Sequence, residues 1–120
     1  MTGMQRGSMP KPGERALKAF DGLLPDAPGV TIRPMFGNRS AFVNGNMFAG
    51  LFGDRLFVRL DASGQDAVMA EGGSAFEPMP GHAMKGYVCL PEGWLENETA
   101  TRKRIAEALD FTSRMPPKKK

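Results

Sequence analysis

Apolar residues along the chain recur in two patterns, one typical of helices and the other of strands. Over residues 14–24 they recur every three or four positions, which predicts a helix with one buried face. A second such helix is predicted over residues 97–114, where Ile105, Ala108 and Leu109 share one side with Thr112. Helices are therefore expected at both ends of the folded part.

Between these helices, short apolar runs are separated by turn residues. Asn44-Gly45 predicts a tight hairpin turn, because both of its central positions need positive φ, and Gly53-Asp54 predicts a second turn. Three antiparallel strands follow from these turns, at residues 39–43, 47–52 and 55–60. Residues 30–36 contain Pro34, which allows at most an edge strand or a broken one.

The second half of the chain continues with shorter elements. Asp61 can cap a helix that runs to about Ala70, and Gly72-Gly73 can end it. Residues 74–81 predict a broken strand with two prolines, and residues 83–90 a more regular one. The predicted fold is a single α+β domain: an antiparallel meander sheet with helices packed on one face, including N- and C-terminal helices.

Two of the predicted strands have one aliphatic side and one basic and aromatic side. Alternation over residues 55–60 places Leu56, Val58 and Leu60 together, away from the intervening positions. Over residues 84–90 it groups Met84 with Val88 and Leu90, opposite Lys85, Tyr87 and Cys89. If the aliphatic sides meet the helices, the other sides form a candidate partner-binding face of Arg55, Phe57, Arg59, Lys85 and Tyr87.

Three interpretations of this candidate face stay open. It can be a contact with a protein partner or with a second copy of the chain, which is the first hypothesis. Aromatic rings beside arginines on a sheet also occur in proteins that bind single-stranded nucleic acid, which is the alternative. The third interpretation is a structural face that is partly covered by the rest of the chain.

Composition and charge divide the 120-residue chain into three parts: a flexible leader at 1–12, a domain at 13–115 and a basic tail at 116–120. The formal net charge is +3, and the lysines at 118–120 account for this excess. Removing Arg6, Lys11 and these lysines from the 16 basic residues leaves 11 against 13 acidic ones. The folded body is therefore slightly acidic, which weakens the case for nucleic acid.

The sequence predicts no catalytic, cofactor-binding or metal-binding residues. Cys89 and His82 are the only residues of their types, and seven positions on one strand would place them on opposite faces. An enzyme that uses Cys89 is kept only as a third hypothesis, and a zinc site would need four such ligands. The glycines match no phosphate-binding motif.

The sequence also bears on location. A single cysteine suits a reducing compartment, so we expect the cytoplasm. The first residues lack the apolar segment of a secretory signal, and no run of apolar residues is long enough to cross a membrane. We therefore expect no membrane association.

A longer string resembles the N-terminal domain family of TfoX, the competence regulator also called Sxy. The resemblance rests on Met35-Phe36-Gly37, Asn44-Gly45-x-Met47-Phe48, Gly53-Asp54-x-Leu56-Phe57-Val58 with Asp61, and Met84-x-x-Tyr87-x-x-x-Pro91-Glu92. It covers about residues 14–112 and implies a compact α+β domain, a bacterial cytoplasm and a link to transcriptional control of DNA uptake. The regulators it resembles carry a further C-terminal domain, whereas the sequence here ends soon after the last predicted helix. A stand-alone domain is therefore expected.

Overall fold

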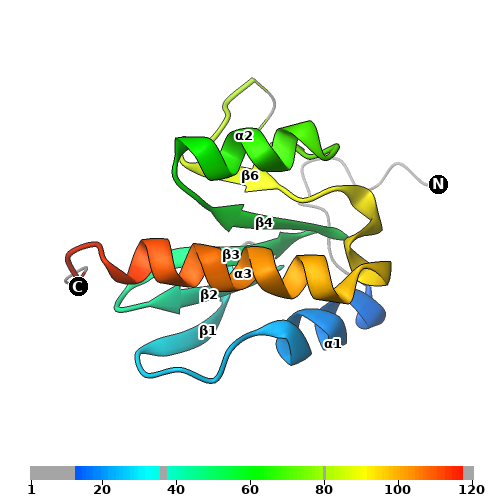
Figure 1. Cartoon of the computed structure of the whole chain (residues 1–120). Coiled ribbons are helices and arrows are strands. Elements are labelled where there is room, and N and C mark those ends of the chain that lie inside the picture. Colours follow the sequence, from blue (N-terminus) through cyan, green and yellow to red (C-terminus); the bar gives the residue numbers. More distant parts are fainter. Residues whose placement is uncertain (1–12, 36–37, 80, 118–120) are drawn as a thin grey trace.

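The computed structural model describes residues 13–35, 38–79 and 81–117 (Figure 1). The leader expected over 1–12 and the lysines at 118–120 lie outside that part. The described residues form an α+β domain with a six-stranded antiparallel sheet and three α-helices, as predicted. Among them no helix is both long and apolar enough to cross a bilayer.

The sheet has the strand order β1-β2-β3-β4-β6-β5, and each neighbouring pair is antiparallel. Its strands are β1 (Val30–Met35), β2 (Asn38–Val43), β3 (Asn46–Phe52), β4 (Arg55–Arg59), β5 (Ser74–Ala75) and β6 (Tyr87–Cys89). The first four strands follow one another as hairpins, so the predicted meander is confirmed. β1 is an edge strand, which also agrees with the prediction from Pro34.

The hairpin turns have the backbone geometry that the sequence predicts. Asn44 has φ 52° and Gly45 has φ 84°, and positive φ at both positions is what a type I′ turn requires. Gly53, in the next turn, has φ 63°. Local turn residues therefore set where β2, β3 and β4 reverse direction, and an irregularity between Ala41 and Phe42 then shifts the register of β2 on β3.

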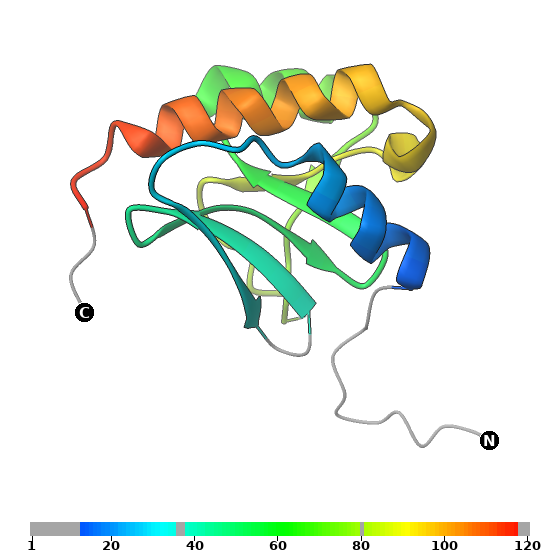
Figure 2. The ribbon, with the colours of Figure 1, turned by 90° about the horizontal axis from the view of Figure 1, so that it is seen from below.

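The helices α1 (Glu14–Leu23), α2 (Ala62–Ala70) and α3 (Glu98–Ser113) pack on one face of the sheet. Figures 1 and 2 show α2 and α3 on the same side of it. Asp61 caps α2 as predicted, because its Oδ1 accepts a hydrogen bond from the backbone N–H of Gly64 at 2.8 Å. A short 3-10 helix, η2 (Glu92–Glu96), precedes α3 and was not predicted.

The main core lies between this sheet face and the helices. Phe20 of α1, Val68 of α2 and Ile105 of α3 are fully buried there. Strand residues complete it, including the predicted Leu56, Val58 and Leu60 together with Ala41, Val43, Phe48, Ala49, Leu51 and Val88. The side chains predicted to face the helices on β4 therefore do so.

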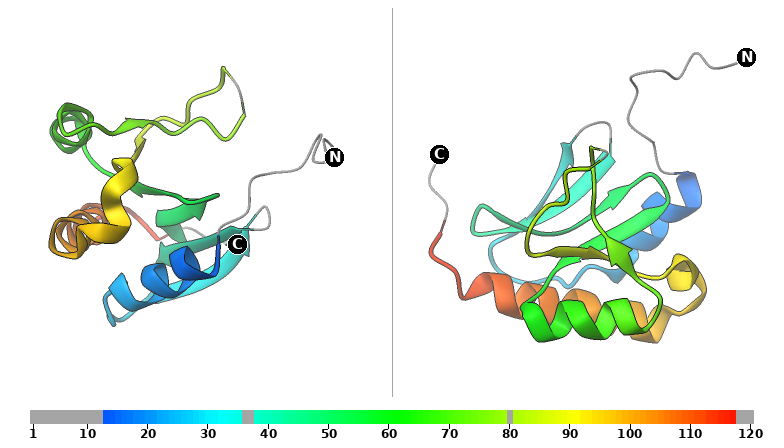
Figure 3. Two further views of the ribbon diagram at one scale, coloured as in Figure 1. Left: turned by 90° about the vertical axis from the view of Figure 1, so that its right-hand side faces the viewer. Right: turned by 90° about the horizontal axis from the view of Figure 1, so that it is seen from above.

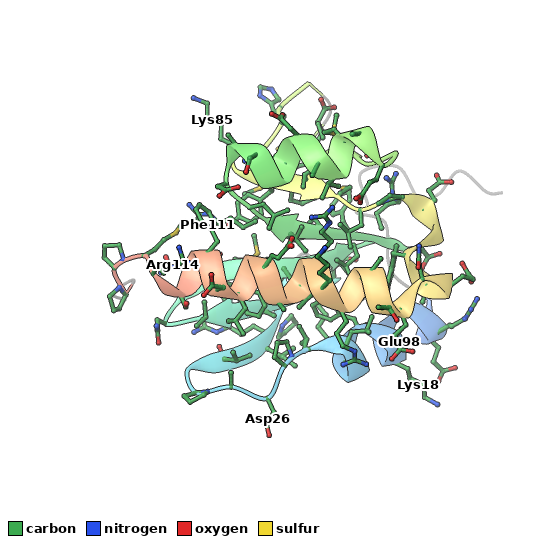
Figure 4. All side chains as sticks on the ribbon, in the orientation of Figure 1. Lys18, Asp26, Lys85, Glu98, Phe111 and Arg114 are labelled. Carbon is green, nitrogen blue, oxygen red and sulfur yellow. The ribbon has the colours of Figure 1, made fainter. Side chains whose placement is uncertain are left out.

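The strand predicted over residues 83–90 is shorter than expected, because β6 begins only at Tyr87. Gly86 has φ 88°, a left-handed conformation that interrupts the strand before it. Met84 consequently packs against the cluster of Phe57, Phe76 and Cys89 on the other face, so its predicted grouping with Val88 and Leu90 is wrong. Lys85 lies outside β6 and is exposed, and Figure 4 shows it pointing away from the domain.

The broken strand predicted at 74–81 is likewise reduced to two residues, Ser74 and Ala75. The chain then leaves the sheet, and Met79 and His82 form an isolated bridge. We call residues 76–79 and 81–86 the covering segment. Figure 3 shows it extending beyond the sheet on the side opposite α2 and α3.

Candidate binding site on the helix-free face

The sheet face opposite the three helices, here called the helix-free face, brings together four of the five predicted site residues. Residues directly opposite each other in an antiparallel pair point to the same side. Phe57 is opposite Gly50 on β3 and Cys89 on β6, and Arg59 is opposite Tyr87. Arg55, at the start of β4, has the same parity and joins them. Lys85 does not, because it precedes the strand.

Phe57 is not available on the surface, as a partner-binding residue would be. Its side chain is 3% exposed, and the ring of Phe76 stacks on it with centroids 4.0 Å apart and planes 11° from parallel. The Tyr87 ring meets the Phe57 ring edge to face, with centroids 5.8 Å apart, and the Phe52 ring meets the Phe76 ring in the same way at 5.6 Å. The covering segment thus closes the centre of this face with aromatic contacts.

The Phe57 ring occupies the space that a side chain at position 50 would fill. A Cβ at this position would lie 2.5 Å from Cζ of Phe57 and 2.8 Å from Oγ of Ser40. Because β3 and β4 are paired directly at this point, a side chain on β3 would displace the ring. The absence of a side chain at Gly50 therefore permits the stack of Phe57 on Phe76.

Beside this stack the helix-free face contains a cavity of about 350 Å³, here called the hollow. Its lining is mostly aromatic and methionine side chains, with exposed Met79 at the rim. The lining residues are Ser40, Phe42, Gly45, Asn46, Met47, Leu51, Phe52, Phe57, Arg59, Phe76, Pro78, Met79, Met84 and Tyr87. The hollow thus includes three of the five predicted site residues, and Arg55 and Lys85 are not among them.

The polar group of Tyr87 is already bonded within the protein. Its hydroxyl donates a hydrogen bond to the backbone carbonyl of Met47 at 3.1 Å. The guanidinium carbon of Arg59 lies 5.4 Å from the centroid of the Tyr87 ring, a cation–π contact. Burial raises the pKa of the Tyr87 hydroxyl, and the charge of Arg59 and a hydrogen bond from its side chain oppose this only in part. Tyr87 is therefore a neutral phenol at neutral pH.

Arginines on this face differ from those elsewhere in the part of the chain that the structure describes. Arg15, Arg39, Arg102, Arg104 and Arg114 each form an ion pair with an acidic side chain. Arg33, Arg55 and Arg59, in contrast, form none within the described residues. The helix-free face thus carries positive charge without acidic partners of its own.

Two of these arginines are held by contacts of other kinds. The guanidinium carbon of Arg33 lies 5.1 Å from the centroid of the Phe42 ring. Arg55 donates from Nη2 to Oγ of Ser74 at 2.9 Å and to the carbonyl of Leu90 at 3.3 Å, while its buried Nε has no partner. Arg55 is therefore a structural residue between β4 and the strands beside it.

Cys89 and His82 do not form a reactive arrangement in the described structure. Cys89 is buried against Phe57 and Phe76, and burial raises its pKa, which the charge of Arg55 and a hydrogen bond from Ser74 oppose more weakly. His82 is exposed in the covering segment. A thiolate nucleophile needs the opposite environment, with a lowered pKa and access to solvent.

Potential metal ligands are also dispersed. Among the described residues no three His, Cys, Asp or Glu side chains come close enough to hold a metal ion.

Sequence reasoning missed the residues that give the hollow its shape, above all Phe76 and Phe42. The two prolines after Phe76 indicated that the strand could not continue, but not that the chain folds back over the sheet. Phe42 alternates with Ala41 and Val43, which face the core. That alternation was a usable signal for its position on the helix-free face.

Comparison with known proteins agrees with the fold and the motifs. No curated protein matches the chain. The model of the TfoX N-terminal domain matches residues 22–112, which include all six strands, α2 and almost all of α3. The chain therefore belongs to the TfoX N-terminal domain family.

Proposed function

We propose that the chain is a non-enzymatic binding module that acts in the cytoplasm through protein contacts made by its helix-free face. The regulatory setting, transcriptional control of competence-type genes, is suggested by the resemblance to TfoX. Family membership supports a TfoX-like module, and the proposal adds the mode of action to it.

The observation that carries this proposal is the hollow, an apolar depression on the face that no helix covers. Met79 at its rim is 59% exposed, although methionine is usually buried. Flexible methionine side chains around an apolar depression are typical of surfaces that adapt to a protein partner. Met47 and Met84 line the same hollow.

The positions of Cys89 and His82 support binding over catalysis. A buried thiol with a raised pKa is a poor nucleophile, and the histidine that could activate it lies exposed in another segment. The third hypothesis, an enzyme that uses Cys89, thus has little support from the geometry.

Single-stranded nucleic acid is the second candidate, because Arg33, Arg55 and Arg59 lack acidic partners within the described residues. Stacking on a base would require an exposed ring, however, and Phe57 already stacks on Phe76. Phosphate contacts from Arg33 and Arg59 would remain, and binding through them would weaken with added salt.

Site-specific photo-cross-linking tests the first candidate. A photoreactive phenylalanine analogue replaces Met79 at the rim of the hollow, and in the control protein it replaces Met69, which is 48% exposed on α2. We expect a defined cross-linked protein, identified by mass spectrometry, from position 79 and not from position 69. The same product from both positions, or none from either with a strictly monomeric protein in light scattering, would contradict the proposal. A labelled DNA strand at low salt, cross-linked only from position 79, would favour nucleic acid instead.

A further inference from the structure

We infer that the hollow is a binding site for a small free molecule with an apolar, ring-sized body and one carboxylate, and that Arg59 receives the carboxylate. This goes beyond protein contacts at the helix-free face and does not require them. The inference rests on the shape of the hollow and on the charge at its wall.

The size and lining of the hollow suit a small organic ligand. Its volume of about 350 Å³ lies at the lower end of the range for ligand pockets, which is roughly 300–1,000 Å³. Phe42, Phe57 and Phe76 contribute rings, and Met47 and Met84 contribute flexible side chains that adjust to a flat body. Such a pocket favours an apolar body of one or two rings.

The positive charge at the wall of the hollow favours a ligand with a negative charge. Arg59 is the one charged residue among the described residues that line the hollow. It forms no ion pair with any acidic side chain in the part of the chain that the structure describes. It lies half-buried, and its guanidinium rests against the Tyr87 ring and donates one hydrogen bond to the Tyr87 hydroxyl. A guanidinium has five N–H donors, so others remain for an acceptor. A carboxylate would supply both the missing negative charge and the acceptor oxygens.

A cationic ligand is disfavoured by the same residue. Aromatic rings around a pocket can hold a quaternary or methylated ammonium group, but in this hollow Arg59 already occupies the face of Tyr87 as the cation. Arg33, over Phe42, and Arg55, beside Cys89, add charge of the same sign on this face. A second cation would therefore meet repulsion, whereas an anion would meet attraction.

A matched pair of probes tests this inference: naphthoate, which carries a carboxylate, and naphthamide, which has nearly the same shape and no charge. Isothermal titration calorimetry is expected to show one-to-one binding of naphthoate, about tenfold or more tighter than naphthamide, as charge-assisted hydrogen bonds predict. Equal affinities for the two probes, or no binding of naphthoate up to its solubility limit, would overturn the inference. This comparison uses the wild-type chain and needs no variant.

The position of the probe is tested by NMR of labelled methionine methyl groups. Met47, Met79 and Met84 line the hollow, and Met69 on α2 serves as the internal control. We expect naphthoate to shift the signals of the first three and not that of Met69. A shift at Met69 as large as the others would indicate non-specific binding and overturn the site.

Variants test the role of Arg59. Arg59→Gln should remove the preference for naphthoate, whereas Arg102→Gln, which removes the same charge from α3, should keep it. An unchanged preference in a folded Arg59→Gln protein would overturn the assignment of the carboxylate to Arg59. If Arg59→Gln does not fold, Arg59→Lys replaces it: a weakened preference for naphthoate supports the paired N–H donors of Arg59 as the carboxylate contact, and an unchanged affinity for both probes would overturn that assignment. Failure of these experiments leaves cross-linking at position 79 unaffected, so the two proposals can be distinguished.

Discussion

Gly50 is the residue on which the packing of the helix-free face depends most directly. We expect Gly50→Ala to destabilise the domain by about 1–3 kcal/mol, the usual cost of overpacking a filled site. The added methyl group would lie 2.5 Å from the Phe57 ring, which is itself held by Phe76 and cannot move aside without losing its stack. Urea unfolding followed by circular dichroism measures the change in the free energy of unfolding.

Gly22 provides the matched control for this substitution. It lies within α1, and a Cβ there would meet nothing within 4 Å. Gly22→Ala should therefore stabilise the domain by about 0.5–1 kcal/mol, because alanine loses less conformational entropy than glycine in a helix. If Gly50→Ala were as stable as Gly22→Ala, the packing described for Phe57 would be wrong.

Single residues also show where sequence reasoning succeeds and where it ends. Alternation along β4 correctly separated Leu56 and Val58, in the main core, from Phe57 on the other face. It could not predict that Phe57 is buried, because that depends on Phe76, which is nineteen positions away and reaches the sheet through an irregular segment. Alternation gives the side of a strand and not what covers that side.

The side chain of Arg104 on α3 forms an ion pair with Glu71, the residue that ends α2, on the face of the sheet that both helices share. Its guanidinium pairs with Glu71 at the end of α2 at 2.6 Å and with Glu107 on α3 at 2.9 Å, and its side chain is 13% exposed. Because this charge is largely shielded from water, we expect Arg104→Ala to cost about 1–2 kcal/mol of unfolding free energy. Chemical denaturation with and without added salt measures it.

Arg102 is the comparison for this pair of helices. It pairs with Glu98 within α3, and its side chain is 51% exposed, so Arg102→Ala should cost only about 0.3–0.5 kcal/mol. Equal losses for the two variants would show that Arg104 acts as an ordinary surface ion pair. A larger loss for Arg104 is expected to persist at high salt, where the smaller one disappears.

Elements set by local residues were predicted well, and elements set by distant contacts were not. The hairpins around Asn44-Gly45 and Gly53 were predicted because asparagine and glycine are the residues that most readily adopt positive φ. The 3-10 helix around Trp94 was missed, because the indole Nε1 donates to the carbonyl of Asp54, forty positions away. The strand predicted over residues 83–90 was too long, because the sequence alone does not show that Gly86 adopts positive φ and interrupts it.

The two faces of the sheet differ in how they are stabilised. On the helix side a continuous apolar core is flanked by ion pairs such as those of Arg39 with Asp21 and Arg104 with Glu71. On the helix-free side a small aromatic cluster around Phe57, Phe76 and Cys89 lies beside arginines that have no acidic partners among the described residues. On the helix side the charges are paired within the chain, whereas on the helix-free side Arg33 and Arg59 have no acidic partner among the described residues and the hollow remains open.

We expect burial of Cys89 to make the stability of the whole domain sensitive to alkaline pH. Burial raises the pKa of its thiol in the folded state, so the unfolded chain loses this proton at a lower pH than the folded chain does. The stabilisation is present below the pKa of an unfolded thiol, about 8.5, and is lost as pH rises from there toward the folded value. The free energy of unfolding should therefore fall with pH in this window.

A comparison with Cys89→Ala isolates this effect from other groups that titrate in the same range. The raised pKa of Tyr87 acts in the same direction at higher pH, but Tyr87 is present in both proteins, so its contribution cancels in the difference. We expect the difference in unfolding free energy, wild type minus Cys89→Ala, to decrease between about pH 7.5 and about pH 9.5 in urea titrations. A difference that stays constant would mean that the Cys89 thiol ionises as readily in the folded domain as in the unfolded chain. That result would require the aromatic cluster to open to solvent, and it would return a thiolate at Cys89 to consideration.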